Sequence, residues 1–247
     1  MDLFIISGGS RGFGEALTKL ALDQDHGVIA ISRYEIQNTS SNLAFYSISH
    51  DLSDFTGLTE KLEKTLHLFE THHPFDLQSV HLINNAALIE PVGPLVNLEP
   101  EAIQKSIRVN LESPILLTQF FLQHFNHFEG WKTVTNISSG AAFRPIPSWE
   151  LYCSTKAGLK MFSENLDLDL MDQKAKVISF SPGIMDTSMQ KHIRSLSPSQ
   201  FPRVVDFQKM KEEHQLRNPQ TVASCLLQLL SLPEQIGKVV YDVQEFD

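Results

Sequence analysis

The sequence predicts an α/β protein with one doubly wound, mostly parallel sheet of about seven strands and helices on both faces. Short apolar runs alternate with stretches of helical periodicity along the whole chain, which is typical of a parallel sheet whose crossovers are helices. The first apolar run ends in a glycine cluster, where a buried strand would turn into a helix. No internal repeat and no linker rich in Pro, Gly and Ser divides the 247 residues, so we expect a single domain over residues 1–247.

The elements follow from two kinds of local pattern. Strands are predicted where a short apolar run stops at glycine or polar residues. These runs cover residues 3–6, 28–32, 43–49, 79–83, 131–137, 176–180 and 238–241. Helices are predicted where apolar residues recur every three or four positions, at residues 15–22, 54–70, 102–128, 149–171 and 221–230. We expect Pro114 to break or kink the third of these helices.

Residues 186–216 fit the alternation least well. The segment is polar, contains Pro198 and Pro202, and mixes Met and Phe with basic residues. A long irregular insertion late in an α/β domain often covers a binding site. We therefore expect a substrate lid here, and the alternative is a solvated surface excursion.

The composition excludes several classes of protein. The chain has 20 Lys and Arg against 29 Asp and Glu, a net charge of −9 that is unsuited to binding nucleic acid through overall charge. Cys153 and Cys225 are not in metal-ligand spacing, so we expect free thiols in a reducing compartment and no metal site. The first apolar run stops at Ser7 and no later run approaches ~18 residues, which argues against a signal peptide and a membrane span. These features predict a cytoplasmic protein.

The glycine cluster predicts a site for a dinucleotide. Residues 7–14 read SGGSRGFG and lie between the first predicted strand and the first predicted helix. Glycines permit the tight turn there and let the backbone approach a pyrophosphate, while the helix N-terminus offers free N–H groups and a positive dipole end. The position at the first strand–helix junction makes this interpretation stronger than a glycine-rich turn alone would.

The end of the second predicted strand favours NADPH over NADH. Folds that bind NAD usually place Asp or Glu about 20 residues after the glycines, to hold the ribose 2′-hydroxyl. Here Ser32 and Arg33 stand at that place, and Arg33 is 33 − 14 = 19 residues beyond Gly14. A guanidinium can pair with a 2′-phosphate through two hydrogen bonds, and Arg11 would add a second cation. The alternative is that Arg33 is an ordinary surface arginine.

A tyrosine and a lysine four residues apart suggest acid–base chemistry. Tyr152 and Lys156 would share one face of a helix. The ordinary pKa of tyrosine, about 10, is high for proton exchange at neutral pH, and a nearby ammonium would lower it. Ser139 ends the preceding strand, 152 − 139 = 13 residues before Tyr152, where its hydroxyl could bind a carbonyl oxygen. The alternatives are a surface Tyr–Lys pair and a serine of ordinary turn chemistry.

Four further motifs accompany these residues. They are Asn84-Asn85-Ala86-Ala87, Arg108-Val109-Asn110, Asp51-Leu52, and Pro182-Gly183 followed by Thr187. In order and spacing, the whole set resembles the short-chain dehydrogenase/reductase family, whose glycine loop is Thr-Gly-x-x-x-Gly-x-Gly. The chain departs from the family pattern at Ser7, which replaces Thr, and at Ala87, which replaces the last Gly of Asn-Asn-Ala-Gly. The resemblance covers nearly the whole chain and implies a Rossmann fold.

The resemblance also implies a role for each matching residue. Tyr152 would protonate the carbonyl oxygen as hydride arrives, Lys156 would bind the nicotinamide ribose and lower the tyrosine pKa, and Ser139 would orient the carbonyl. Asn110, the fourth catalytic position, would support a water that relays protons to Lys156. The implied NADP(H) contacts are Ser7, Gly8, Ser10, Arg11, Gly12, Phe13, Gly14, Ser32, Arg33, Asp51, Leu52, Asn85, Ala86, Tyr152, Lys156, Pro182, Gly183, Ile184 and Thr187.

Within the family, the chain is most similar to the branch of sepiapterin reductases and (S)-benzoin-forming benzil reductases. Residues 31–33, 81–86, 137–141, 152–158 and 182–189 carry this likeness. The residues expected near the substrate are all apolar or aromatic, which suits a bulky ketone or 1,2-diketone. They are Ala141, Phe143, Trp149, Met185 and Met189.

Several alternatives remain open at this level. A pterin ketone is the second substrate class, and Asp242 is the carboxylate that would hold its amino group. A non-catalytic NADP-binding regulator is a third interpretation, although such proteins typically lose the tyrosine or the lysine. The two longest predicted helices would pack across the interface of a homodimer or homotetramer, as family members' helices do.

Overall fold

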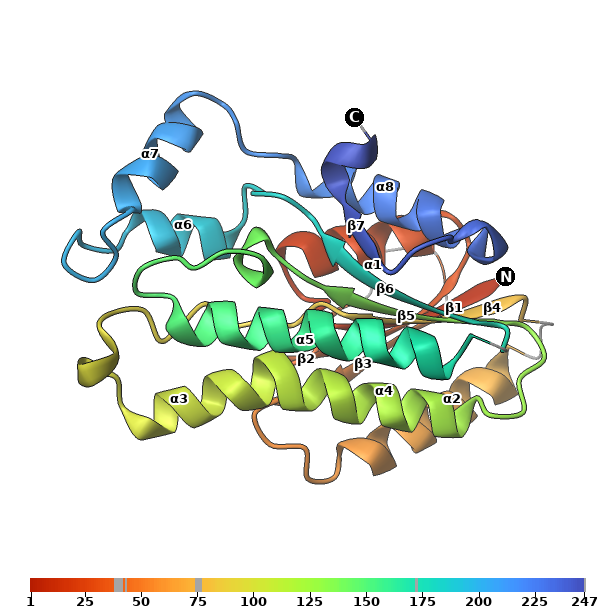
Figure 1. Ribbon diagram of the computed structural model, residues 1–247. Coiled ribbons are helices and arrows are strands. Elements are labelled where there is room, and N and C mark those ends of the chain that lie inside the picture. Colours follow the sequence, from red (N-terminus) through yellow and green to blue (C-terminus); the bar gives the residue numbers. More distant parts are fainter. Residues whose placement is uncertain (38–41, 43, 74–76, 172, 247) are drawn as a thin grey trace.

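A seven-stranded sheet forms the centre of the protein. A computed structural model describes residues 1–37, 42, 44–73, 77–171 and 173–246 (Figure 1). The strand order is β3-β2-β1-β4-β5-β6-β7, and all the described pairings are parallel. The strands are β1 (Asp2–Ser7), β2 (Gly27–Ser32), β3 (Phe45–Ser49), β4 (Ser79–Asn84), β5 (Trp131–Ile137), β6 (Ala175–Ser181) and β7 (Val240–Asp242). The predicted fold class is confirmed. The strand predicted at 43–49 begins at Phe45, and Leu43 lies outside the described residues.

Helices cover both faces of the sheet. They are α1 (Gly12–Asp23), α2 (Leu58–His72), α3 (Pro100–Ile107), α4 (Ser113–His124), α5 (Glu150–Asp169), α6 (Ser188–Arg194), α7 (Val204–Glu212) and α8 (Pro219–Leu230). Short 3-10 turns are η1 (Leu95–Asn97), η3 (Gly140–Ala142), η4 (Pro233–Gln235) and η5 (Val243–Phe246). Figure 1 shows α1 and α8 on one face and α2, α4 and α5 on the other. No helix in the described part of the chain is both long and apolar enough to cross a membrane.

Successive strand residues supply two separate cores. Ile6 and Ala30 pack with α1 and α8, whereas their neighbours Ile5 and Ile29 pack with α2 and α4. Side chains alternate across a strand, so a strand covered on both faces must be apolar at every position. This is why the strands appear in the sequence as continuous apolar runs.

The helix predicted at 102–128 continues past its proline. A π-helical turn, η2 (Arg108–Glu112), joins α3 to α4, and Pro114 lies in the first turn of α4. Proline has no N–H for the regular bond to the carbonyl of residue 110, and the widened turn accommodates this loss. The sequence predicts a break or kink at Pro114. The structure has one wide turn there, which contains Asn110, and the helix is not broken.

Residues 186–216 are more regular than the sequence indicates. The segment contains α6 and α7, which project from the end of the sheet in Figure 1. The Thr187 hydroxyl accepts a hydrogen bond from the Gln190 N–H at 3.4 Å and caps α6. Ile193 and Phe207 are buried on the inner faces of these helices. Both helices are shorter than three turns, so tertiary packing stabilises them more than local propensity does.

Candidate active site

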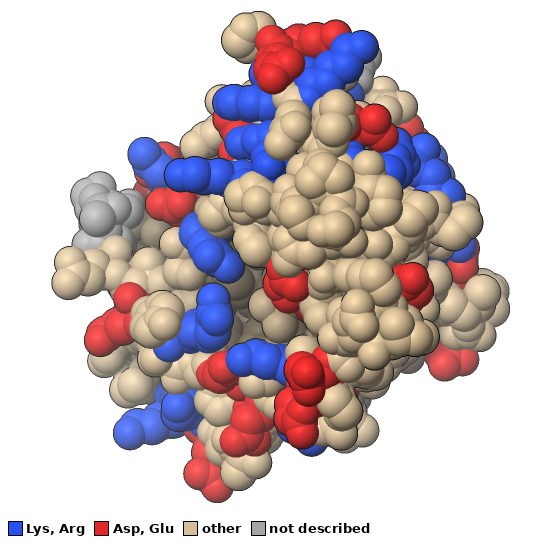
Figure 2. Space-filling model, turned by 90° about the vertical axis from the view of Figure 1, so that its left-hand side faces the viewer, with Lys and Arg blue, Asp and Glu red and all other residues tan. Residues whose placement is uncertain are grey.

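A cavity of about 580 Å³ crosses the carboxyl end of the sheet. Its wall extends from Arg33, after β2, to Pro182, after β6, and includes residues of α6 and α7. Ligands of open α/β sheets bind at this edge. Figure 2 shows the face on the left of Figure 1, where a line of Lys and Arg side chains, with Asp and Glu among them, borders a broad and mostly uncharged surface.

The glycine loop leaves space for a phosphate group. Gly8 and Gly12 have φ of +73° and +59°, a left-handed backbone that favours glycine. A Cβ on Gly14 would lie 2.2 Å from the Gly8 carbonyl oxygen, so only glycine lets α1 pack this closely against the loop. No side chain caps the N-terminus of α1, whose first N–H groups are therefore available to an anion. This cradle fits a dinucleotide pyrophosphate.

Ser7 and Asn85 brace the loop. The Ser7 hydroxyl accepts hydrogen bonds from the backbone N–H groups of Asn85 and Ala86, at 3.0 and 3.1 Å. Asn85 Nδ2 donates to the carbonyl oxygens of Ser7 and Gly8, at 3.0 and 3.2 Å. Ser7 and Gly14 do not line the cavity, although both are predicted to contact the cofactor. Both lie behind the loop, where they shape it.

Basic side chains line the cavity beyond β2. Arg11 and Arg33 line this end, and neither has a carboxylate within 4 Å among the described residues. Lys105, on α3, also lines it, and its Nζ lies 3.8 Å from Asp51 Oδ2. A backbone hydrogen bond from Ser53 lowers the pKa of Asp51. Lys105 belongs to none of the sequence motifs, and no local pattern singles it out.

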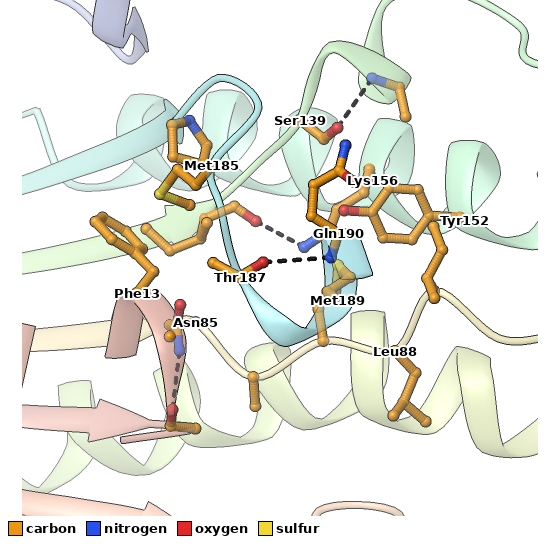
Figure 3. A pocket seen from close by; sticks show the side chains of 18 of the residues that line it. Phe13, Asn85, Leu88, Ser139, Tyr152, Lys156, Met185, Thr187, Met189 and Gln190 are labelled. Atoms are coloured by element: carbon orange, nitrogen blue, oxygen red, sulfur yellow. Dashed lines mark hydrogen bonds between the residues drawn. The ribbon is translucent and has the colours of Figure 1, made fainter. Parts of the chain in front are cut away.

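Tyr152, Lys156 and Ser139 meet in the middle of the cavity wall (Figure 3). Tyr152 and Lys156 lie one turn apart on α5 and are 7% and 2% exposed. Lys156 Nζ donates to the Ile137 carbonyl oxygen at 2.7 Å and lies 5.8 Å from the centroid of the Tyr152 ring. The Ser139 hydroxyl accepts from the Ala141 N–H at 3.2 Å, which orients it at the start of η3.

Burial controls the protonation of this pair. It raises the pKa of Tyr152 to about 12, although a hydrogen bond with Ser139 acts in the opposite direction. It also lowers the pKa of Lys156 to about 8. The expected lowering of the Tyr152 pKa by the ammonium does not occur here, because desolvation disfavours both charged groups. Tyr152 is therefore a protonated donor at neutral pH, and the pKa of Lys156 is shifted toward neutrality.

Asn110 lies in the π-helical turn behind the wall. Its Oδ1 accepts from the Leu88 N–H at 2.7 Å, and its Nδ2 donates to the Leu88 carbonyl oxygen at 2.8 Å. A longer contact of 3.4 Å joins Nδ2 to the Thr155 hydroxyl on α5. The Asn110 side chain does not line the cavity, and it links the loop after β4 to the helix that carries Tyr152.

Apolar side chains form the far end of the cavity. The Trp149 ring stacks on Phe201 at 4.9 Å and meets Tyr152 edge-on at 5.5 Å. Ala141, Met185 and Met189 line the wall as predicted. Phe143 does not, because it is 53% exposed and stacks under Lys160 Nζ, 5.4 Å from its ring centroid. Four further apolar residues that no sequence pattern singles out also line the cavity: Ile89, Ile146, Ile193 and Phe207.

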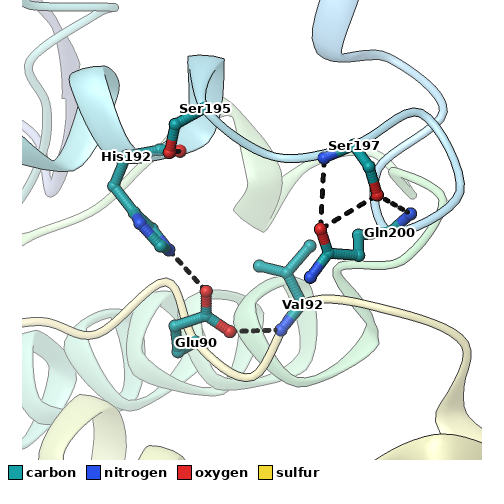
Figure 4. A network of polar contacts seen from close by, with 6 residues as sticks. All are labelled: Glu90, Val92, His192, Ser195, Ser197 and Gln200. Carbon is teal, nitrogen blue, oxygen red and sulfur yellow. Dashed lines mark hydrogen bonds and ion pairs between the residues drawn. The ribbon is translucent and has the colours of Figure 1, made fainter.

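The segment 186–216 packs over this apolar end. Besides the contact between Phe201 and Trp149, His192 Nε2 of α6 lies 2.5 Å from Glu90 Oε1, on the loop after β4 (Figure 4). The second oxygen of Glu90 accepts from the Val92 N–H at 2.8 Å. The segment 186–216 is thus joined to Trp149 by an aromatic stack and to the loop after β4 by a polar contact.

The family assignment agrees with this geometry. A family model described as "short chain dehydrogenase" matches residues 2–197, which is most of the chain. The chain belongs to the short-chain dehydrogenase/reductase family. Most residues of its motifs, which are scattered over the sequence, line the cavity described above, whereas Ser7, Gly14 and Asn110 lie behind its wall.

Individual relatives of this family support the assignment. The chain is 37% identical to a benzil reductase ((S)-benzoin forming) of Bacillus subtilis, over 100% of both chains. It is 31% identical to the sepiapterin reductase of Bos taurus, covering 92% of this chain and 89% of the relative. A solved short-chain dehydrogenase/reductase of Saccharomyces cerevisiae superposes with a TM-score of 0.82 at 25% identity, covering 98% of this chain and 96% of that one. The protein is therefore an oxidoreductase that acts on CH–OH and C=O groups with a nicotinamide cofactor.

Proposed function

We propose that this short-chain dehydrogenase/reductase is an NADPH-dependent carbonyl reductase. It would reduce a ketone to an alcohol, or a 1,2-diketone to the (S)-hydroxyketone, like the (S)-benzoin-forming benzil reductases that it resembles. The observation that carries the proposal is the place of Tyr152 and Ser139. Both line the cavity where it meets the apolar side chains of Trp149, Ile146 and Phe207. Hydroxyl donors beside an apolar chamber suit a bulky, uncharged carbonyl compound.

Tyr152, Ser139 and Lys156 have different roles in the proton transfer. The bound nicotinamide supplies hydride to the carbonyl carbon. Tyr152, protonated because its pKa is about 12, donates its proton to the carbonyl oxygen as negative charge develops there. Ser139 orients that oxygen. Lys156, with a pKa of about 8, exchanges protons near neutral pH and can restore the proton of Tyr152.

The basic end of the cavity supports NADPH as the cofactor. Arg11 and Arg33 line it and lack carboxylate partners within 4 Å among the described residues. Two such guanidinium groups favour a ribose 2′-phosphate, which a carboxylate at the end of β2 would repel.

The experiment is a substrate panel. NADPH oxidation is followed at 340 nm with benzil, 1-phenyl-1,2-propanedione, sepiapterin, an aliphatic ketone and no substrate, and each assay is repeated with NADH. The proposal predicts rapid reduction of the aromatic diketones with NADPH and an (S)-hydroxyketone on chiral chromatography. Absence of turnover with NADPH still bound would favour the non-catalytic regulator.

A pterin ketone is the second candidate substrate. Asp242, at the end of β7, lines the same cavity and is the carboxylate that would bind a pterin amino group. Its Oδ1 accepts from the Gln244 N–H at 3.0 Å, which fixes the carboxyl group. Preference for sepiapterin in the panel would place this candidate first.

We also propose a lid and an oligomer. Residues 186–216 would open and close over the substrate, since α6 and α7 both line the cavity. A homodimer or homotetramer would cover the outer face of α5, where Met161 and Leu168 are 57% and 65% exposed. Exposed apolar side chains seven residues apart lie on one side of a helix and suit a helix from a second copy.

A further inference from the structure

Gln190, on α6, is a buried polar residue with an unpaired end. It is 3% exposed and lines the cavity. Its amide nitrogen Nε2 makes no hydrogen bond to any residue that the structure describes. A buried amide without a partner destabilises the fold, so its presence in a cavity wall indicates a donor that is paired when the cavity is filled.

The contact between Gln190 and Arg194 identifies which atom of the Gln190 amide is unpaired. Arg194 Nη1 lies 2.8 Å from Gln190 Oε1, and a guanidinium has only donors, so the oxygen must face it. Arg194 Nη2 lies 3.7 Å from Asp186 Oδ1, and Asp186 Oδ2 lies 2.6 Å from Lys211 Nζ. These contacts hold the guanidinium in place, and they turn the NH₂ group of Gln190 away from Arg194.

Gln190 lines the same cavity as Tyr152 and Ser139. Figure 3 shows the Gln190 side chain rising from α6 toward Ser139 and Tyr152. Ser139 directly precedes η3 and Tyr152 lies on α5, whereas Gln190 lies on α6, in the segment 186–216. Trp149 Nε1 is a second buried donor without a partner among the described residues at this end, whereas the side chains of Ile146 and Phe207 offer none.

We infer that Gln190 Nε2 donates a hydrogen bond to a second substrate oxygen, on the carbon next to the carbonyl that Tyr152 protonates. This inference rests on the proposed function and narrows it to ketones with an adjacent carbonyl or hydroxyl oxygen. A site built to bind such an oxygen discriminates against substrates that lack it, because the buried donor is then left unpaired. Gln190 is thus a residue that determines substrate specificity.

The test compares two activated ketones that differ in the second oxygen. 1-Phenyl-1,2-propanedione has it, and 2,2,2-trifluoroacetophenone does not. In Gln190→Leu, kcat/KM for the dione should fall at least ~10-fold, whereas kcat/KM for the trifluoroketone should change less than about twofold. Lys191→Leu, at an exposed position of the same helix outside the cavity, should change neither value by more than about twofold.

The other outcomes overturn the inference. An equal loss of kcat/KM with both ketones would show that Gln190 has a packing role. A rise in the KM for NADPH with both ketones would show that Gln190 Nε2 binds the cofactor. If the wild-type enzyme reduces neither ketone, the proposed function fails and the inference fails with it. Should Gln190→Leu not fold, as judged by thermal melting, Gln190→Glu removes the donor at the same size and must show the same selective loss.

Discussion

Arg33 is the residue on which the choice of cofactor depends. It follows β2, lines the basic end of the cavity and has no carboxylate within 4 Å among the described residues. A hydrogen-bonded guanidinium–phosphate pair contributes about 1.5–3 kcal/mol, so Arg33→Ala should raise the KM for NADPH by roughly 10–100-fold. The KM for NADH, which lacks the phosphate, should change less than about threefold. Equal changes in the two Michaelis constants, measured at saturating ketone, would show that Arg33 does not bind the 2′-phosphate.

Individual residues could be predicted from the sequence where their chemistry is local. Tyr152 and Lys156 are four apart on one helix, and both line the cavity as the spacing indicates. The orientation of Phe143 could not be predicted, because it depends on whether the chain after η3 turns its side chain inward or toward Lys160. The protonation of Tyr152 likewise depends on how deeply the folded protein buries it. Gln190 gives no sequence signal, since its unpaired nitrogen exists only after folding.

At the scale of elements, an aromatic stack and a polar contact of unequal strength help to hold the segment that carries α6 and α7. His192 and Glu90 are about half exposed, at 45% and 49%, and such ion pairs contribute about 0–1 kcal/mol. Phe201 is fully buried against Trp149, and truncating such a side chain costs about 3–5 kcal/mol. We therefore expect Phe201→Ala to raise the KM for the ketone by at least ~10-fold and Glu90→Gln to raise it by less than about fivefold.

Steady-state kinetics with NADPH at saturation would measure both Michaelis constants for the ketone. A larger effect for Glu90→Gln than for Phe201→Ala would show that the polar contact, and not the aromatic stack, holds the segment in place.

The predictability of the elements follows from how each is stabilised. The strands and long helices have apolar patterns that repeat at the period of the element, so local sequence was sufficient to predict them. The helices α6 and α7 are short, and their buried residues are few. Their stability comes from contacts such as Phe201 with Trp149, which join residues far apart in the chain. The π-helical turn before Pro114 has no periodic pattern of its own.

For the whole molecule, a histidine cluster away from the cavity makes stability depend on pH. His81 is fully buried in β4, with its Nδ1 2.7 Å from the Thr133 hydroxyl and its Nε2 3.9 Å from Asp2 Oδ2. Burial lowers the pKa of His81 and that of nearby His26. The unfolded chain, whose histidines have a pKa of about 6.5, then binds more protons than the folded one below that pH.

The sign of this linkage gives a direct prediction. The contribution of His81 to the free energy of unfolding is fully present above pH ~6.5, and it is lost as the pH falls through the lower pKa of the folded state. The urea midpoint should stay nearly constant from about pH 8 to 7 and decrease from about pH 6.5 to 5, and His81→Leu should flatten that decrease. An equally steep decrease in His81→Leu would assign the acid sensitivity to other groups.

The parallel sheet and its switch in strand order explain why the site lies where it does. β1 has β2 on one side and β4 on the other, so the loops after β1 and β4 separate and leave the cavity between them. The alternating pattern of strands and helices predicts the doubly wound parallel sheet, and the Rossmann fold is implied by the family resemblance. The shape of the apolar end is not predictable in the same way, because α6 and α7 form it through long-range packing.

The central claim is that Tyr152 donates the proton during reduction of a carbonyl group. The measurement is the rate of NADPH oxidation at 340 nm with 1-phenyl-1,2-propanedione, for the wild-type enzyme and for Tyr152→Phe. Loss of the phenol O–H should lower kcat by roughly 10²–10⁴-fold, while NADPH binding, followed by fluorescence titration, stays within about twofold. A Tyr152→Phe enzyme that reduces the diketone at a rate near that of the wild type would contradict the account.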